Sequence, residues 1–125
     1  MKTGRVIFRV IFGPPIGLTF DVDIPETPAE MQRGLRGGPP PSARGMLFDF
    51  GDGVVPQMTM SGVAFPLDMV FIAASGQVIG ILPHVPPNTP GPWTCYVPCR
   101  WVLELSANSG GKIPFLSRAA VFYAL

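Results

Sequence analysis

The histidine and cysteine side chains that could support nucleophilic catalysis or zinc binding are few: one histidine, His84, and two cysteines, Cys95 and Cys99. A nucleophile activated by a base would have to use His84, since the chain has no second histidine. The three side chains are ligands that zinc accepts, but no second ligand pair accompanies them, and strand geometry separates the two sulfurs widely. We therefore expect no catalytic residue, no metal and no cofactor, and predict that the chain is not an enzyme.

The two cysteines could instead form a disulfide. Their Cα atoms would then have to lie within about 7 Å, which requires a bend at Pro98. The N-terminal segment is not typical of a secretion signal, because Arg9 interrupts its apolar run and no small-residue cleavage site follows. Without export to an oxidising compartment, the sequence favours two free, partly buried thiols.

Two acidic residues lie inside apolar segments. Asp68 begins a strand-like run, where it is either a site residue paired with an arginine or a structural carboxylate that caps backbone amides near Pro66. The structural interpretation is favoured. Strand alternation places Glu104 on one face with Val102, opposite Trp101, and predicts a solvent-facing or salt-bridged position rather than a general acid.

Aromatic side chains gather around the proline-rich segment 83–92. Trp93, Tyr96 and Trp101 could form a platform for a sugar or a proline-rich peptide. The alternative, which we favour, is a core and rim cluster beneath a loop. If the chain binds a ligand, Asp68, Trp93 and Trp101 are the candidate site residues.

The composition limits the partners. The net charge is +1 and only 14% of the residues are charged, so nothing favours nucleic acid or an anionic membrane. No apolar run is long enough to span a bilayer. We expect a cytoplasmic protein, or one incorporated into a particle such as a virion assembled there. The weakly charged surface favours protein partners or self-association.

The elements that must position these residues are mostly short strands. Thr27, Pro28 and Glu30 fit a capping box that begins one helix of about nine residues. Met46, Met58, Met60 and Met69 fall on expected strands and predict core positions. The expected strands span residues 5–12, 18–24, 46–50, 54–60, 67–73, 77–82, 101–106 and 119–124, with 51–53 as a tight turn. We predict one domain, residues 1–125, with a mainly β (α+β) fold: a small antiparallel barrel-like or sandwich core of about eight or nine short strands and one short helix.

Three short sequence motifs resemble those of a known family: Gly-Met-Leu-Phe at 45–48, Pro-Leu-Asp at 66–68 and Val-Leu-Glu-Leu at 102–105. Their order and spacing resemble DUF192, a family of uncharacterised proteins. The resemblance implies a fold for nearly the whole chain and no established activity. Where the family usually has a polar Trp-Met-Lys-Asn-Thr element, this chain has Thr59-Met60-Ser61-Gly62-Val63. The resemblance therefore implies that a polar function of that element is lost here.

Low charge, apolar composition and the altered 59–63 element together favour a non-catalytic structural or interaction module that packs into an oligomeric assembly. One concrete form is a virion accessory protein, such as a capsid decoration or cement protein. The alternative is a small-ligand binding domain, for a carbohydrate-like molecule, that uses Asp68, Trp93 and Trp101.

Overall fold

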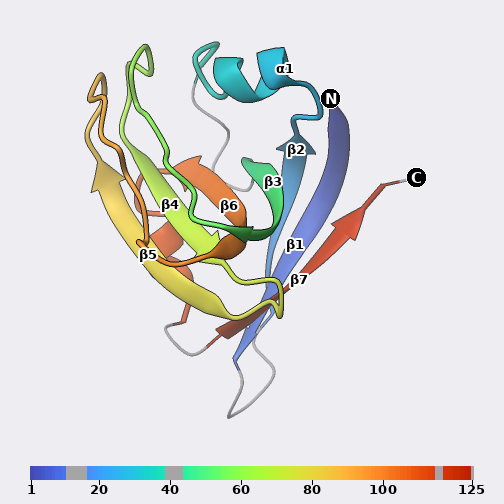
Figure 1. Cartoon of the computed structure of the whole chain (residues 1–125). Coiled ribbons are helices and arrows are strands. Elements are labelled where there is room, and N and C mark those ends of the chain that lie inside the picture. The colour runs from blue at the N-terminus through green and yellow to red at the C-terminus, as the bar shows by residue number, and fades with distance from the viewer. Residues whose placement is uncertain (11–16, 39–43, 115–116, 125) are drawn as a thin grey trace.

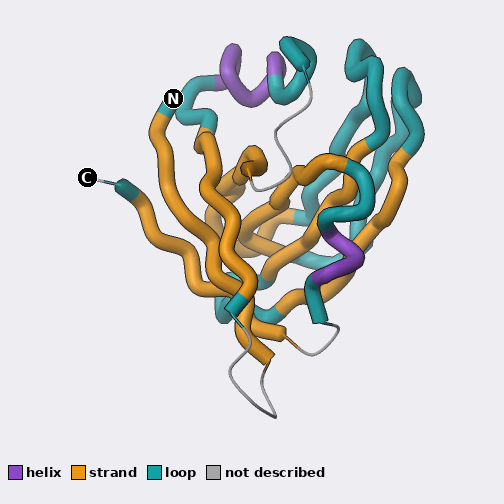
Figure 2. Tube along the Cα trace, turned by 180° about the vertical axis from the view of Figure 1, so that it is seen from behind, coloured by secondary structure: helices purple, strands orange, loops and turns teal. Residues whose placement is uncertain are grey.

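The computed structural model describes residues 1–10, 17–38, 44–114 and 117–124. Seven strands form one sheet in the order β5-β4-β6-β3-β2-β1-β7. The strands are β1 (Lys2–Val10), β2 (Leu18–Ile24), β3 (Arg44–Val54), β4 (Leu67–Ile72), β5 (Val78–Val85), β6 (Cys99–Ser106) and β7 (Ser117–Tyr123). Neighbouring strands are antiparallel except β2 and β3, which are parallel. The sheet curls into an open barrel, with α1 (Pro28–Arg33) at one end (Figures 1 and 2).

The mainly β, barrel-like fold with one short helix is confirmed. The strand count differs because the expected turn at 51–53 and return strand at 54–60 do not form. Residues 51–53 continue β3 through an irregular pairing with β6, and of residues 55–60 only Met58 makes a β-bridge. Part of the expected strand at 5–12 lies outside the described residues.

The helix begins as the sequence predicts. The Thr27 hydroxyl accepts a hydrogen bond from the Glu30 amide at 3.1 Å, and the Glu30 carboxylate accepts one from the Thr27 amide. The helix is six residues long, shorter than expected, because Gly34 leaves the helical conformation with φ of 51°. Glycine adopts this left-handed region without the steric cost that a Cβ atom imposes.

Two hydrophobic clusters pack on opposite faces of the same strands. The first fills the inside of the curled sheet and includes Val6, Phe20, Leu103 and Ile113. The second lies on the other face of β3, β4 and β6 and contains all four methionines predicted to be core. Every residue of β4 is consequently buried.

A 3-10 helix, η1 (Gly110–Lys112), follows β6. The structure contains no helix that is long and apolar enough to cross a membrane, among the residues it describes.

Candidate functional site

A pocket of about 390 Å³ lies on the outer face of the sheet, between α1 and the end of β3. Six apolar side chains line it: Met31, Leu35, Phe48, Phe50, Met58 and Val63. Three ionisable side chains also line it: Arg33, Arg36 and Glu104. We call this cavity the Glu104 pocket. Its lining comes from four separate parts of the chain, so the pocket exists only in the folded protein.

Strands β3 and β6 form the floor. Residues 46, 48 and 50 of β3 alternate onto the outer face, and the rings of Phe48 and Phe50 stack with centroids 6.4 Å apart. Glu104 on β6 lies between Met46 of β3 and Met69 of β4, with which it is directly paired. The carboxyl group thus rises from a floor of apolar side chains.

The segment from α1 to Arg36 forms one wall. Met31 and Leu35 lie four residues apart and pack against the outer cluster. Arg36 then donates a hydrogen bond from Nε to the carbonyl of Ser61 at 2.9 Å, which joins this wall to the opposite one. Arg33 and Arg36 are both exposed at the edge of the pocket, which we call its mouth.

The opposite wall is the segment 57–63. Met58 exchanges two backbone hydrogen bonds with Trp93, at 2.9 and 2.8 Å, and the Met60 amide donates to the Thr89 carbonyl at 2.9 Å. The proline-rich segment therefore supports this wall, and the two loops lie side by side near α1 (Figure 1). The segment 59–63, where the chain departs from the DUF192 pattern, supplies Thr59 and Val63 to the pocket.

Glu104 is the one residue of this pocket that combines deep burial with an ionisable group. Its residue exposure is 4%, and its carboxyl makes no hydrogen bond or ion pair with any residue the structure describes. Burial raises the pKa of Glu104 to about 8, and the positive charge of Arg36 lowers it only in part. The prediction of a solvent-facing or salt-bridged position is wrong, because α1 and segment 57–63 cover this face of β6.

Asp68 is fully buried and has a different environment. Its carboxylate accepts hydrogen bonds from the backbone amides of His84, at 2.8 Å, and Gly110, at 2.7 Å. This matches the structural interpretation in kind, although the amides belong to β5 and η1 rather than to the turn near Pro66. No oxygen of Asp68 faces the Glu104 pocket.

The candidate residues Asp68, Trp93 and Trp101 do not converge. Trp101 packs in the inner cluster and lies opposite Ile72, four strand positions from the Asp68–Leu105 pair. Trp93 packs on the outer cluster, on the other face of the sheet, and donates from Nε1 to the Thr89 hydroxyl at 3.1 Å. Trp93 thus contributes to the site only indirectly, by supporting the wall at Met58.

Both cysteines are free, with Cys95 half-buried and Cys99 buried. Burial, with the neighbouring Cys95, raises the pKa of the Cys99 thiol to about 12. No group of three or more potential metal ligands exists within the described ranges. The His84 ring contacts the Asn108 side chain.

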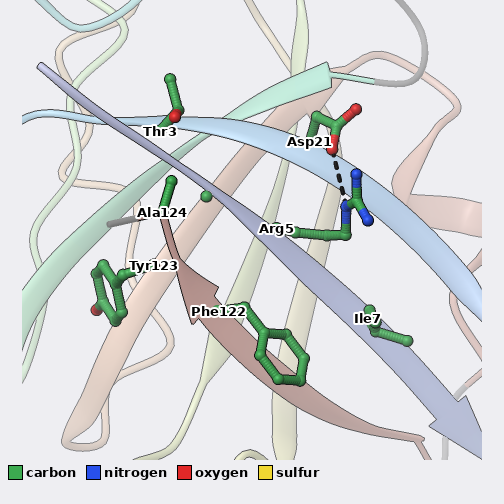
Figure 3. Close-up of a pocket in the computed structure, with 8 residues that line it drawn as sticks. Thr3, Arg5, Ile7, Asp21, Phe122, Tyr123 and Ala124 are labelled. Atoms are coloured by element: carbon green, nitrogen blue, oxygen red, sulfur yellow. Dashed lines mark hydrogen bonds and ion pairs between the residues drawn. The ribbon is translucent and has the colours of Figure 1, made fainter.

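A second hollow, of about 490 Å³, lies on the outer surface of β1 and β7 (Figure 3). Its charged side chains, Arg5 and Asp21, pair with each other at 3.0 Å and are 59% and 53% exposed. Their charges are therefore mutually satisfied and hydrated, which leaves little to recognise a ligand. The Glu104 pocket is smaller but contains an ionisable group whose pKa burial raises to about 8.

The comparisons with known proteins add a family and a fold. The family model of DUF192, described as an uncharacterized ACR, matches residues 13–113. No curated protein matches the chain.

The solved structures that are similar to the chain include two crystal structures. One is a protein from Sinorhizobium meliloti 1021, described as a "putative transcription regulator", with 28% identity and a TM-score of 0.81, over 95% of this chain and 93% of that one. The other is a protein of unknown function from Novosphingobium aromaticivorans, with 21% identity and a TM-score of 0.79, over 94% and 82% of the two chains. At 21% identity, the similarity to the second protein indicates a shared fold and nothing about function.

Proposed function

The chain belongs to the DUF192 family, and from this premise and the geometry of its pocket we propose that it is a binding module for a small, largely apolar molecule held in the Glu104 pocket. The proposal keeps the ligand-binding alternative reached from the sequence and changes its site. Asp68 and Trp101 are no longer candidate binding residues, and Trp93 only supports the pocket wall at Met58.

The observation that carries the proposal is the carboxyl of Glu104, which lines the pocket in a residue only 4% exposed and has no hydrogen-bond or ion-pair partner among the described residues. Burial of an ionisable side chain among apolar groups costs stability, so a glutamate in such a place is rare in an ordinary core. Strongly perturbed ionisable groups in clefts are typical of functional sites. The pocket volume of about 390 Å³ also falls within the range, about 300–1,000 Å³, of small-molecule sites.

A fragment screen by two-dimensional amide NMR tests the proposal. We expect apolar fragments to shift the amide signals of Leu35, Phe48 and Val63, which line the pocket from three segments. A Leu35→Trp variant should fill the cavity and abolish these shifts. The matched control, Ile7→Trp, fills the hollow on β1 and β7 and should leave them intact. Failure of the whole library to shift pocket amides would refute the proposal.

A second candidate function, self-association, is supported by a separate surface. Val54, Val55, Tyr96 and Val97 are 40%, 40%, 82% and 46% exposed. The pairing of Val54 with Cys99 brings the segments that carry these four side chains next to each other. A second copy of this chain is the occupant that we propose, since like apolar patches can bury each other across a twofold axis.

Sedimentation analysis tests this second candidate. We expect a dimer at high protein concentration that Tyr96→Lys converts to a monomer. A monomer at all concentrations would contradict it. The virion accessory role is a prediction from the sequence that neither the patch nor the comparisons favour.

A further inference from the structure

We propose that the ligand of the Glu104 pocket is a small organic acid, with its anionic group at Arg33 and Arg36, an apolar body along the walls and a hydrogen-bond acceptor at Glu104. This inference rests on the proposed function and specifies the chemical class of the ligand. It is carried by the order of the chemical groups from the mouth of the pocket to its floor.

The mouth is positively charged. Neither Arg33 nor Arg36 makes an ion pair with any described carboxylate. Five acidic residues each pair with another cation: Asp21, Asp23, Glu26, Glu30 and Asp49. Asp68 is occupied by backbone amides. Arg36 is also held in place through Nε by Ser61, which leaves the rest of its guanidinium free to bind an anion.

The floor presents a neutral hydrogen-bond donor. The charged groups that face Glu104 are Arg33 and Arg36, both from the α1 wall. Strands β3 and β4 contribute Met46, Phe48 and Met69, and segment 57–63 contributes no titratable side chain. Since burial dominates, the carboxyl is mostly protonated at pH 7, with its pKa at about 8. A protonated carboxyl can donate its O–H to a carbonyl or ring nitrogen.

A cationic ligand fits these groups less well. It would have to pass two unpaired guanidinium groups and then form an ion pair with Glu104 among apolar side chains. Such a buried pair lacks the further hydrogen bonds that offset desolvation of both charges. A neutral donor and acceptor pair at the same place desolvates no ion, and the anion at the mouth stays partly hydrated.

Matched probes can test this assignment. 4-Acetylphenylacetate carries an anion, an aromatic body and a ketone acceptor in the proposed order. 4-Acetylphenylacetamide removes the charge, 2-(4-acetylphenyl)ethylamine reverses it, and 4-isopropylphenylacetate replaces the ketone by an isostere that accepts no hydrogen bond. We expect the first probe to bind at least tenfold more tightly than the other three, by NMR titration of the labelled full chain at pH 6.5.

The pH dependence of probe binding tests whether the Glu104 carboxyl at the floor of the pocket must be protonated. Affinity for 4-acetylphenylacetate should fall about tenfold between pH 7 and pH 9, because deprotonation of Glu104 removes the donor and adds a negative charge. Glu104→Gln retains a donor and should remove this pH dependence. Arg36→Gln should reduce the affinity for the acid to that for the amide, Arg36→Lys should restore part of it, and Arg9→Gln, on β1, should change nothing.

The outcomes separate the two proposals. Tighter binding of the amine, or affinity that rises with pH, would overturn the organic-acid class while leaving the pocket as a binding site. Binding of library fragments but of none of the four probes would do the same. If neither fragments nor probes shift the pocket amides, the proposed function fails as well.

Discussion

Glu104 lowers the stability of the folded state and also supplies the polar group of the proposed binding pocket. In the unfolded chain its carboxyl is hydrated, with a pKa near 4.5, whereas in the folded chain the pKa is about 8. The folded state therefore binds the proton more tightly. The contribution of Glu104 to the free energy of unfolding is then highest below about pH 4.5 and falls as pH rises towards 8. The difference corresponds to roughly 5 kcal/mol at most.

We predict that Glu104→Gln weakens this pH dependence and makes the protein more stable than the wild type at pH 8. The neutral amide has no charge to desolvate, so the penalty of the buried carboxylate disappears. Urea unfolding followed by circular dichroism at pH 5, 6.5 and 8 measures the effect. Glu26→Gln, which alters an exposed pair with Lys2, serves as the control. Equal pH slopes for wild type and Glu104→Gln would show that the carboxyl does not titrate in this range.

At the scale of elements, Asp68 ties three segments together. It lies on β4, and its two oxygens accept from the amides of His84 on β5 and Gly110 on η1. The chain passes so close at Gly110 that an added Cβ atom would come within 2.9 Å of the Asp68 Cβ atom. The carboxylate thus accepts the His84 amide at the register shift between β4 and β5 and also binds the first amide of η1.

We predict that Asp68→Ala lowers the free energy of unfolding by about 2–6 kcal/mol, since each of the two buried amides left without an acceptor costs about 1–3 kcal/mol. Asp68→Asn retains a neutral acceptor and should cost less. Asp21→Ala, which removes an exposed ion pair, should cost at most about 1 kcal/mol. Urea denaturation compares the three variants. A loss for Asp68→Ala no greater than for Asp21→Ala would refute this structural role.

At the scale of the whole molecule, Tyr123 connects the edge strand β7 to β6 and β3 on the other side of the curled sheet. Its hydroxyl accepts from Trp101 Nε1 on β6 at 3.0 Å and donates to the Asp49 carboxylate on β3, although β7 is an edge strand. Partial burial would raise the pKa of Asp49, but hydrogen bonds from Tyr123, Arg100 and the Gly51 amide outweigh it and hold that pKa below its usual value.

We predict that Tyr123→Phe lowers the free energy of unfolding by about 1–2 kcal/mol at pH 7 and shifts the tryptophan emission. Because the folded pKa of Asp49 is depressed, its contribution is present above the unfolded pKa and is lost as pH falls through the folded pKa. The variant should therefore be less sensitive to acid than the wild type. Phe122→Leu, at a 55% exposed position, is the control. Identical acid unfolding curves for wild type and Tyr123→Phe would contradict this connecting role.

Local patterns in the sequence determine much of the fold. The capping box of Thr27 and Glu30 and the alternation of residues 18–24 depend on neighbours only a few residues apart, and both appear in the structure. Alternation also places Glu104 on the same face as Val102, as found. The carboxylate of Asp68, in Pro-Leu-Asp, accepts hydrogen bonds from backbone amides, as the structural interpretation expected, because a carboxylate inside an apolar strand needs buried donors nearby.

What covers each face of the sheet is decided by tertiary structure alone. A period of two residues identifies the face on which Glu104 lies but not whether solvent, a helix or a loop lies above it. Here α1 and segment 57–63, each more than 40 residues away in sequence, cover that face and turn an apparently exposed carboxyl into the floor of a pocket. The ionisation of Glu104 follows from this burial, so the central property of the site arises only when distant segments pack together.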